Sequence, residues 1–169
     1  VKGARFDGHD AAVSAVESGA VLIVAERDTG VKNQLIVSDT REAFSLLSAS
    51  FFGNPAEKLR LVGVTGTNGK TSVTYMLKGI LENAGYKVGL IGTIQNMICD
   101  EVLPSKNTTP DAYELNSLFA QMRDTGCTFA IMEVSSHAIA LDKICGLDFD
   151  IAVFTNLTRD HLDFHNTME

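Results

Sequence analysis

Residues 59–85, LRLVGVTGTNGKTSVTYMLKGILENAG, hold an apolar run, a glycine-rich loop and an amphipathic segment in succession. The run from Leu59 to Val64 is typical of a strand buried on both faces. After the loop, apolar residues recur at helical spacing, and Gly85 follows where a helix would end. These residues are Val73, Met76, Leu77, Ile80, Leu81 and Ala84. The stretch therefore predicts a strand, a loop and a helix whose N-terminus lies beyond the end of the strand.

The loop sequence GTNGKT suits the binding of a nucleoside triphosphate. Gly66 and Gly69 permit a tight turn that directs backbone N–H groups at phosphate oxygens. Lys70 would bring a positive charge to the phosphates, and the Thr71 hydroxyl would complete the coordination of Mg²⁺. The match to the general phosphate-loop pattern is imperfect, because Val64 stands where the first glycine is expected. A glycine-rich turn that happens to precede a lysine is the alternative, which the order of strand, loop and helix disfavours.

The longer stretch GVTGTNGKTS resembles the shorter phosphate loop of the Mur ligases, ATP-dependent enzymes that add amino acids to the peptidoglycan precursor. This resemblance accounts for the missing glycine, and it implies ATP and Mg²⁺ as cofactors. It also implies a set of nucleotide-binding residues. They are Gly66, Thr67, Asn68, Gly69, Lys70, Thr71, Ser72 and Asn156.

The composition is that of a globular α/β protein. The chain has 169 residues, 45% apolar and 21% charged, enough for one domain or parts of two. Its net charge of −7 argues against nonspecific nucleic-acid binding. Three cysteines without a close CxxC pair indicate neither a disulfide framework nor a zinc knuckle, and they favour a reducing, cytoplasmic setting. No apolar run reaches the ~20 residues of a membrane helix. The first residue is not methionine, and we expect a fragment cut at both ends.

Two units are expected. In residues 1–56 the patterns predict a helix after Gly8, strands at 21–25 and 35–37, and a helix that begins after Asp39 with a capping box. Asp7, His9 and Asp10 could be imagined as metal ligands, but a helix cap and a solvated turn are the better interpretation. The phrase FDGHD resembles part of the uridine-binding domain of a Mur ligase. Residues 57–169 alternate strands with helices, which predicts a parallel sheet that binds ligands at the carboxyl ends of its strands.

Within the second unit, Thr109-Pro110-Asp111 predicts a helix start with Thr109 as the cap. Residues 128–134, TFAIMEV, predict a strand that carries Glu133 near its tip, where a carboxylate could reach magnesium. A glutamate that emerges into solvent is the alternative. The following Ser135-Ser136-His137 lacks the G-x-S-x-G elbow of a serine hydrolase, and EVSSHA resembles the corresponding Mur ligase motif.

The segment NLTRDHLDFH places His161 and His165 four residues apart, but no HExxH pattern or third ligand accompanies them, so zinc is disfavoured. By resemblance, Asn156 lies near the nucleotide and His161 helps to hold a second magnesium ion. The implied metal ligands are thus Thr71, Glu133 and His161, and the implied catalytic residues are Lys70, Glu133 and His161. The implied substrate-binding residues are Thr108, Thr109, Ser135 and Lys143. Lys143 departs from the family, which commonly has arginine there, and Leu141 stands where some members have glutamine.

GTNGKTS, NTTPD, EVSSHA and NLTRDHLDFH together resemble the Mur ligases that join meso-diaminopimelate or L-lysine to UDP-N-acetylmuramoyl-L-alanyl-D-glutamate (UDP-MurNAc-dipeptide) through an acyl phosphate. The implied fold is α/β, with the remainder of an N-terminal uridine-binding domain at 1–56 and the N-terminal part of a central ATP-binding domain at 57–169. The amino-acid-binding C-terminal domain is expected to be absent, so we expect the 169-residue chain alone to be inactive and the full-length protein to be monomeric. The alternatives are a folylpolyglutamate synthase-like ligase, where SPH would replace SSH, and a catalytically inactive nucleotide-binding paralogue.

Overall fold

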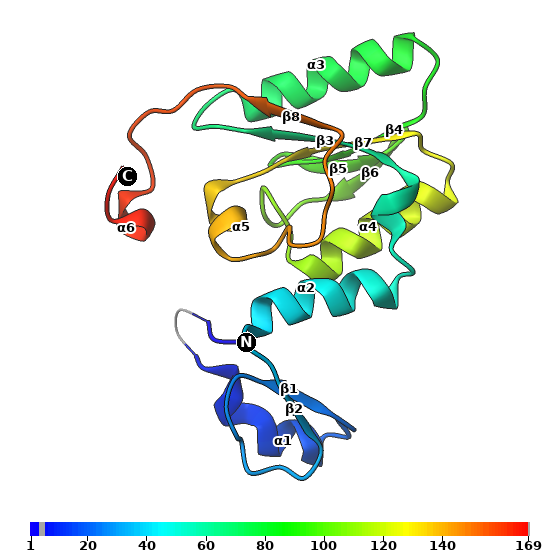
Figure 1. Ribbon diagram of the computed structural model, residues 1–169. Coiled ribbons are helices and arrows are strands. Elements are labelled where there is room, and N and C mark those ends of the chain that lie inside the picture. The colour runs from blue at the N-terminus through cyan, green and yellow to red at the C-terminus, as the bar shows by residue number, and fades with distance from the viewer. Residues whose placement is uncertain (4–5, 169) are drawn as a thin grey trace.

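The computed structural model describes residues 1–3 and 6–168, which form a six-stranded sheet flanked by helices and a smaller two-stranded unit (Figure 1). The helices are η1 (Gly8–Ala11), α1 (Ala12–Glu17), α2 (Thr40–Phe51), η2 (Pro55–Lys58), α3 (Lys70–Asn83), α4 (Ala112–Asp124), α5 (Ser136–Ala140) and α6 (Leu162–His165). The strands are β1 (Ile23–Ala25), β2 (Gln34–Ile36), β3 (Arg60–Thr65), β4 (Val88–Ile91), β5 (Gln95–Ile98), β6 (Glu101–Pro104), β7 (Phe129–Glu133) and β8 (Ile151–Phe154).

The large sheet has the strand order β6-β5-β4-β7-β3-β8. Its four strands β4, β7, β3 and β8 are parallel, which confirms the predicted α/β fold class. The predicted element order is wrong between residues 95 and 104, where β5 and β6 add an antiparallel hairpin at one edge. The hairpin turns at Cys99 with φ +53°, a position without the glycine or asparagine that usually announces such a turn.

Two apolar layers fill the two faces of this sheet, because side chains alternate along each strand. On β3, Leu61 belongs to the layer under α4, whereas Val62 and Val64 belong to the layer under α3. Leu115 and Phe119 of α4 are completely buried in the first layer. Of the apolar residues predicted for α3, Val73, Leu77 and Leu81 pack against the sheet, whereas Met76 and Ile80 are exposed. α3 and α4 cover opposite faces of the sheet (Figure 1).

Helix starts follow local side-chain chemistry. Asp39 caps α2 by accepting from the N–H groups of Arg41 and Glu42, as predicted. The predicted cap at Thr109 is wrong, because Asp111 caps α4 by accepting from Glu114 N at 2.9 Å. Pro110 lies before that cap, and the hydroxyl of Thr109 is occupied elsewhere.

The N-terminal segment is a small α/β unit in which β1 and β2 pair in parallel. Asp7 caps η1 by accepting from His9 N at 3.1 Å, which confirms the capping interpretation. Side-chain and backbone hydrogen bonds from His9 lower the pKa of the Asp7 carboxyl. His9 is buried, and its Nε2 accepts from Glu26 N at 2.9 Å. These residues therefore serve the local fold.

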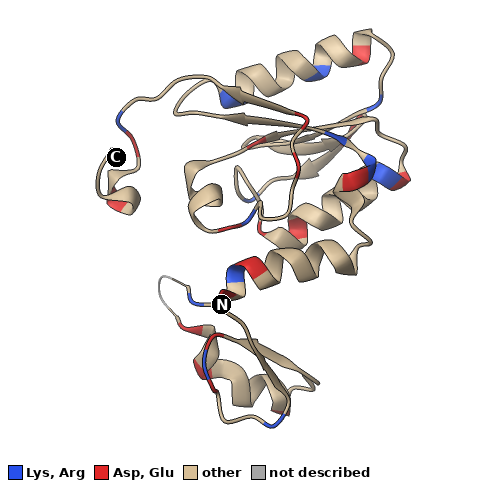
Figure 2. Cartoon of the chain, in the orientation of Figure 1, with Lys and Arg blue, Asp and Glu red and all other residues tan. Residues whose placement is uncertain are grey.

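α2 connects the two parts of the chain and packs along α4. Phe52 lies 5.1 Å from Tyr113 between ring centroids, and Arg123 donates to Phe52 O at 3.0 Å. Acidic and basic residues are distributed over both parts, and both kinds occur in the first turn of α2 (Figure 2). Within the described residues, none of the helices has both the length and the apolar character needed to cross a membrane.

Candidate functional site

The predicted phosphate loop lies between β3 and α3, at the carboxyl ends of the parallel strands. Gly66 has φ +128°, and a Cβ there would overlap Thr155 Oγ1 and lie 2.8 Å from Asn156 O. Gly69 has φ +85° and precedes the first residue of α3. Glycine is thus required at 66 for both conformation and space, and at 69 for conformation.

The segment after β8 supports this loop. Asn156 accepts from Asn68 N at 3.1 Å, donates to Asn68 O at 3.0 Å, and accepts through its backbone oxygen from Thr67 N at 2.9 Å. Thr155 Oγ1 donates to Asn68 O at 2.7 Å, and Thr158 N donates to Thr67 Oγ1 at 2.9 Å. The structure therefore brings Asn156 to the loop, and its contact with the nucleotide stays a prediction. Thr155 and Thr158 were missed because threonine at a strand end has no distinctive pattern.

Lys70 folds back over the loop. Its Nζ donates to Gly66 O at 2.7 Å and to Thr67 O at 3.0 Å. The ammonium group is held by neutral carbonyl oxygens and lines the neighbouring cavity. It can therefore exchange these contacts for the oxygens of an anion.

Glu133 is buried at the tip of β7, with 1% of its surface exposed, so the solvated alternative is wrong. Its Oε1 accepts from Thr71 Oγ1 at 2.9 Å and from Thr93 N at 3.0 Å, while Oε2 accepts from Thr93 Oγ1 at 3.0 Å. Gly92 leaves room for the carboxylate, because a Cβ there would lie 2.5 Å from Oε1. Burial of a carboxylate is tolerated here because several donors converge on it.

The adjacent oxygens of Thr71 and Glu133 fit a magnesium ion, which prefers hard oxygen ligands. Among the described residues, no three His, Cys, Asp or Glu side chains are grouped to hold an ion. Mg²⁺ commonly takes only one or two carboxylates and completes its shell with water and phosphate, so this small donor set suits it. His161, the third predicted ligand, does not belong to this pair but lies on the segment after β8.

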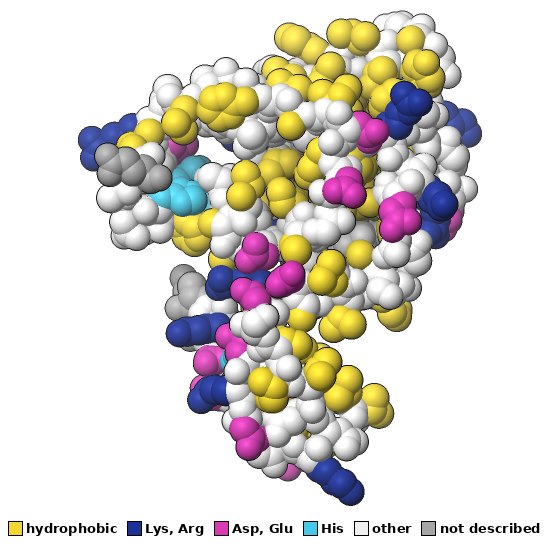
Figure 3. Space-filling view, in the orientation of Figure 1, with side chains coloured by type: hydrophobic (Ala, Val, Ile, Leu, Met, Phe, Trp, Pro, Cys, Tyr) yellow, Lys and Arg dark blue, Asp and Glu magenta, His cyan; other side chains and the backbone are white. Residues whose placement is uncertain are grey.

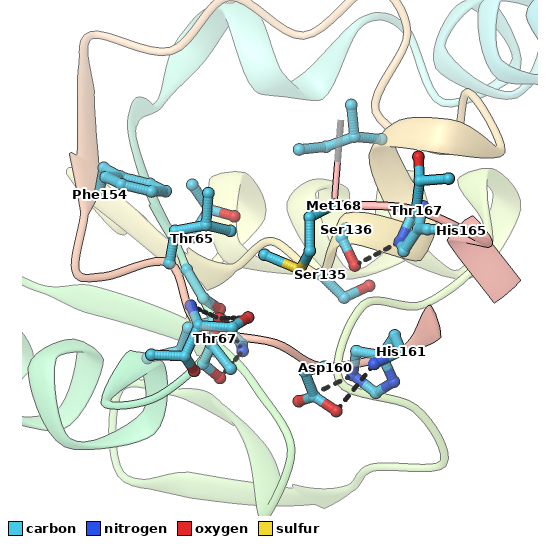
Figure 4. A pocket seen from close by; sticks show the side chains of 15 residues that line it. Thr65, Thr67, Ser135, Ser136, Phe154, Asp160, His161, His165, Thr167 and Met168 are labelled. Carbon is cyan, nitrogen blue, oxygen red and sulfur yellow. Dashed lines mark hydrogen bonds and ion pairs between the residues drawn. The ribbon is translucent and has the colours of Figure 1, made fainter. Parts of the chain in front are cut away.

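A cavity of about 480 Å³ opens beside the loop (Figure 4). The loop, the start of α5 and the segment after β8 form its walls. Its lining includes Gly66, Lys70, Ser135, Phe154, His161 and Met168. The volume is in the range of small-molecule sites.

Three histidines and Phe164 form an aromatic cluster on one side of this cavity, which we call the histidine cluster. The ring centroid of His137 lies 4.7 Å from that of His161, 5.5 Å from that of His165 and 4.2 Å from that of Phe164. His165 Nε2 is 2.9 Å from Ser136 Oγ, and Figure 3 shows histidine side chains beside a hollow in the surface. Burial and the neighbouring histidines lower the pKa of His137. Sequence reasoning missed this cluster because His137 is distant in sequence from the other members.

The four predicted substrate-binding residues gather at the end of β7. Thr109 Oγ1 donates to Glu133 O at 2.9 Å and accepts from Ser135 N at 3.0 Å. Lys143 Nζ donates to Thr109 O at 3.2 Å. Thr108 Oγ1 is 3.0 Å from Thr93 Oγ1. This group of side chains thus directly adjoins the Thr71–Glu133 pair, although its role in binding stays a prediction.

Lys143 also faces a second groove of about 740 Å³ between the start of α2, the start of α4 and residues 1–3. Lys2 and Arg41 line this groove as well, together with one carboxylate, Asp111. Within the described residues, none of the three cations forms an ion pair. Phe44 and Phe164 provide apolar surface. In a chain of net charge −7, this groove is locally positive.

Comparison with known proteins identifies relatives of the same architecture. The family described as "Mur ligase middle domain" matches residues 64–169. UDP-N-acetylmuramoyl-L-alanyl-D-glutamate--2,6-diaminopimelate ligase of Caldanaerobacter subterraneus subsp. tengcongensis is 51% identical over 173 residues, covering 100% of this chain and 36% of the relative. The chain thus spans about a third of the length of the curated relatives it matches.

Solved structures agree with this relationship. A structure of a UDP-N-acetylmuramoyl-L-alanyl-D-glutamate--2,6-diaminopimelate ligase superposes with a TM-score of 0.83 at 31% identity, covering 95% of this chain and 33% of that one. MurF ligase from Thermotoga maritima in complex with ADP gives a TM-score of 0.62 at 29% identity, covering 99% of this chain and 36% of that one. The family match extends over more than half of the chain, from the loop to its end. The chain with the phosphate loop, the buried Glu133 and the NLTRDH segment therefore belongs to the Mur ligase family.

Proposed function

We propose that the protein acts as an ATP-dependent ligase that joins a diamino acid to UDP-MurNAc-dipeptide. The observation that carries this proposal is the direct contact between two groups of residues. The loop residue Thr71 hydrogen-bonds to the side chain of Glu133, and the predicted substrate residue Thr109 donates to the backbone oxygen of the same glutamate. A nucleotide on one side and an acceptor carboxylate on the other would thus be neighbours, as phosphoryl transfer requires.

The nucleotide would occupy the cavity beside the loop. Backbone N–H groups at the start of α3 and the positive end of that helix favour phosphate. Lys70 would leave its two carbonyl partners and bind phosphate oxygens. An ADP complex of the Thermotoga maritima MurF ligase supports the binding of an adenine nucleotide.

Magnesium would be held by Thr71 and Glu133, with His161 as a further predicted ligand. When bound, the ion supplies charge neutralisation to the transferring phosphoryl group. The chain's own contribution is to hold the oxygens of Thr71 and Glu133 together in a buried place. Charge interactions are stronger there than at an exposed surface.

The proposed reaction has two steps. The substrate carboxylate attacks the γ-phosphorus of ATP, which forms an acyl phosphate and releases ADP. The amino group of the incoming amino acid then attacks the acyl carbon, expels inorganic phosphate and forms the amide. Lys70 would bind the phosphate oxygens in the first step, whereas Ser135 and Lys143 would orient the carboxylate.

The positive groove supports an anionic precursor as the first substrate, since UDP-MurNAc-dipeptide carries phosphates and carboxylates. Lys143, where the family commonly has arginine, keeps the charge but cannot offer a bidentate fork. Arg41 faces the same groove and can offer one. We assign residues 1–56 to the uridine-binding domain and 57–169 to the ATP-binding domain. The names of the relatives support diaminopimelate as the incoming amino acid. Monomeric state and cytoplasmic location remain predictions.

The test is an assay of the full-length protein with ATP, Mg²⁺, UDP-MurNAc-dipeptide and either meso-diaminopimelate or L-lysine, with the amide product detected by mass spectrometry. We expect product with the wild-type protein and none with Lys70→Ala. Wild-type protein that binds ATP but forms no product from either amino acid would support the inactive nucleotide-binding paralogue. In a parallel assay with a folate and L-glutamate in place of these substrates, glutamylation of the folate would support the folylpolyglutamate synthase-like alternative.

A further inference from the structure

Thr93 lies just beyond the end of β4 and contacts both oxygens of Glu133. Its backbone N–H donates to Oε1 at 3.0 Å, and its Oγ1 lies 3.0 Å from Oε2. No sequence motif pointed to this residue, which is forty positions away from its partner. The parallel pairing of β4 with β7 brings the two strand ends side by side.

Among the described residues, the hydrogen bonds to the Glu133 carboxylate leave one of its lone pairs without a donor. A carboxylate offers about four lone-pair positions, two on each oxygen. Thr71 Oγ1 and Thr93 N occupy the two positions on Oε1, and Thr93 Oγ1 occupies one on Oε2. The remaining position is therefore on Oε2.

Thr93 also extends this contact to the substrate side of the site. Thr108 Oγ1 is 3.0 Å from Thr93 Oγ1. A threonine hydroxyl has one proton, and a carboxylate can only accept, so Thr93 donates to Glu133 and Thr108 donates to Thr93. The chain Thr108–Thr93–Glu133–Thr71 thus connects a predicted substrate residue with the phosphate loop.

We infer that Thr93 is a positioning residue for the magnesium site, whose hydroxyl orients Glu133 so that its free Oε2 lone pair faces the ion. This inference rests on the proposed function, because it assumes a magnesium–nucleotide complex at the loop. Thr93 contributes no ligand itself. Its hydroxyl determines the rotation of the Glu133 carboxylate. Its backbone N–H is retained when the side chain is substituted, so a variant tests the hydroxyl alone.

The experiment measures ADP binding by the full-length protein with isothermal titration calorimetry, at Mg²⁺ concentrations from an EDTA-chelated baseline upward. Residues that orient a metal ligand typically contribute about 10–100-fold to metal affinity. We expect Thr93→Val to raise the Mg²⁺ concentration for half-maximal enhancement of ADP affinity by about tenfold. Its ADP affinity in EDTA should equal that of the wild type, because the loop itself is unchanged.

Two further variants make the test specific. Thr93→Ser keeps the hydroxyl and should restore the wild-type Mg²⁺ requirement. Thr125→Val, at the exposed end of α4, removes a hydroxyl that, among the described residues, bonds to Gln121 O, and it should leave the Mg²⁺ requirement unchanged. Thr93 is itself exposed, and Thr93→Ala provides a second hydroxyl-free variant if the valine variant folds poorly.

The outcomes separate this inference from the proposed function. Magnesium-dependent ADP binding that is identical in the wild type, Thr93→Val and Thr93→Ala would overturn the role of Thr93 and leave the proposed function standing. A serine variant that behaves like the valine variant would also overturn it, since the hydroxyl would not be the cause. Wild-type protein without magnesium-dependent ADP binding would refute the proposed function together with this inference.

Discussion

Substitution of Gly66 by alanine should damage the phosphate loop through a steric conflict that side-chain movement cannot relieve. A non-glycine residue at φ +128° is strained, at a cost of about 1–3 kcal/mol. The new Cβ would also displace Thr155 Oγ1 and approach Asn156 O at 2.8 Å. Loss of the 2.7 Å bond from Thr155 to Asn68 O adds about 1 kcal/mol. The total is roughly 2–4 kcal/mol.

Thermal denaturation of the 169-residue chain measures this effect. A loss of about 3 kcal/mol corresponds to a decrease in Tm of roughly 6–12 °C for a chain of this size. ADP affinity should fall by about tenfold or more, which corresponds to 1.4 kcal/mol or more, because the loop N–H groups move with Asn68.

Gly79→Ala is the matched control. Gly79 lies inside α3, and a Cβ there would meet nothing within 4 Å. Alanine in a helix interior stabilises by roughly 0.5–1 kcal/mol relative to glycine, so the control should raise Tm slightly and leave ADP affinity unchanged. A Gly66→Ala protein with wild-type Tm and wild-type ADP affinity would show that the loop does not have the geometry described above.

Three further predictions concern charge and pH. Glu133→Gln should raise the magnesium requirement of ATP turnover steeply, because it removes the charge at nearly constant shape; an unchanged Mg²⁺ titration would exclude Glu133 as a ligand. Burial raises the pKa of the Cys127 thiol from 9.0 to about 12, so the stability that this thiol contributes is fully present below pH 9 and is lost as the pH rises above it. Alkylation of Cys127 at pH 8 should be far slower in the folded protein than in urea. Burial lowers the pKa of His137 in the folded protein, so the stability that its neutral form contributes is lost as the pH falls below 6.5. His137→Asn should therefore weaken the dependence of Tm on pH between pH 7 and 5. Rapid alkylation of folded Cys127, or a pH dependence that survives His137→Asn, would contradict the respective assignment.

Lys143 and Arg41 face the same positive groove but differ in the way they bind anions. A lysine places a compact charge on a flexible stem, whereas arginine binds a carboxylate or phosphate through two parallel hydrogen bonds. Arg41 already donates to Lys2 O at 3.0 Å, which holds its guanidinium near the groove. The groove that contains Lys143 therefore also has an arginine.

The amino-acid sequence alone determined the parts of this protein that depend on near neighbours. Continuous apolar runs located β3 and β7, which are buried on both faces, and apolar residues at helical spacing located α3. The glycine loop, Lys70 and Thr71 could be read as one unit because consecutive residues build the phosphate site. Asp39 predicted a helix start because a capping side chain accepts from backbone N–H groups only two or three residues later.

Only the tertiary structure decided how distant strand ends combine. The hairpin of β5 and β6 lacked a turn signature, and Thr109 was mistaken for a cap because its hydroxyl bonds to Glu133 O across 24 positions. Thr93 and the histidine cluster acquire their contacts from the strand order β4-β7-β3-β8, which places separate segments at one edge of the sheet. Local patterns cannot specify such an order, because it is set by the packing of whole elements on both faces of the sheet.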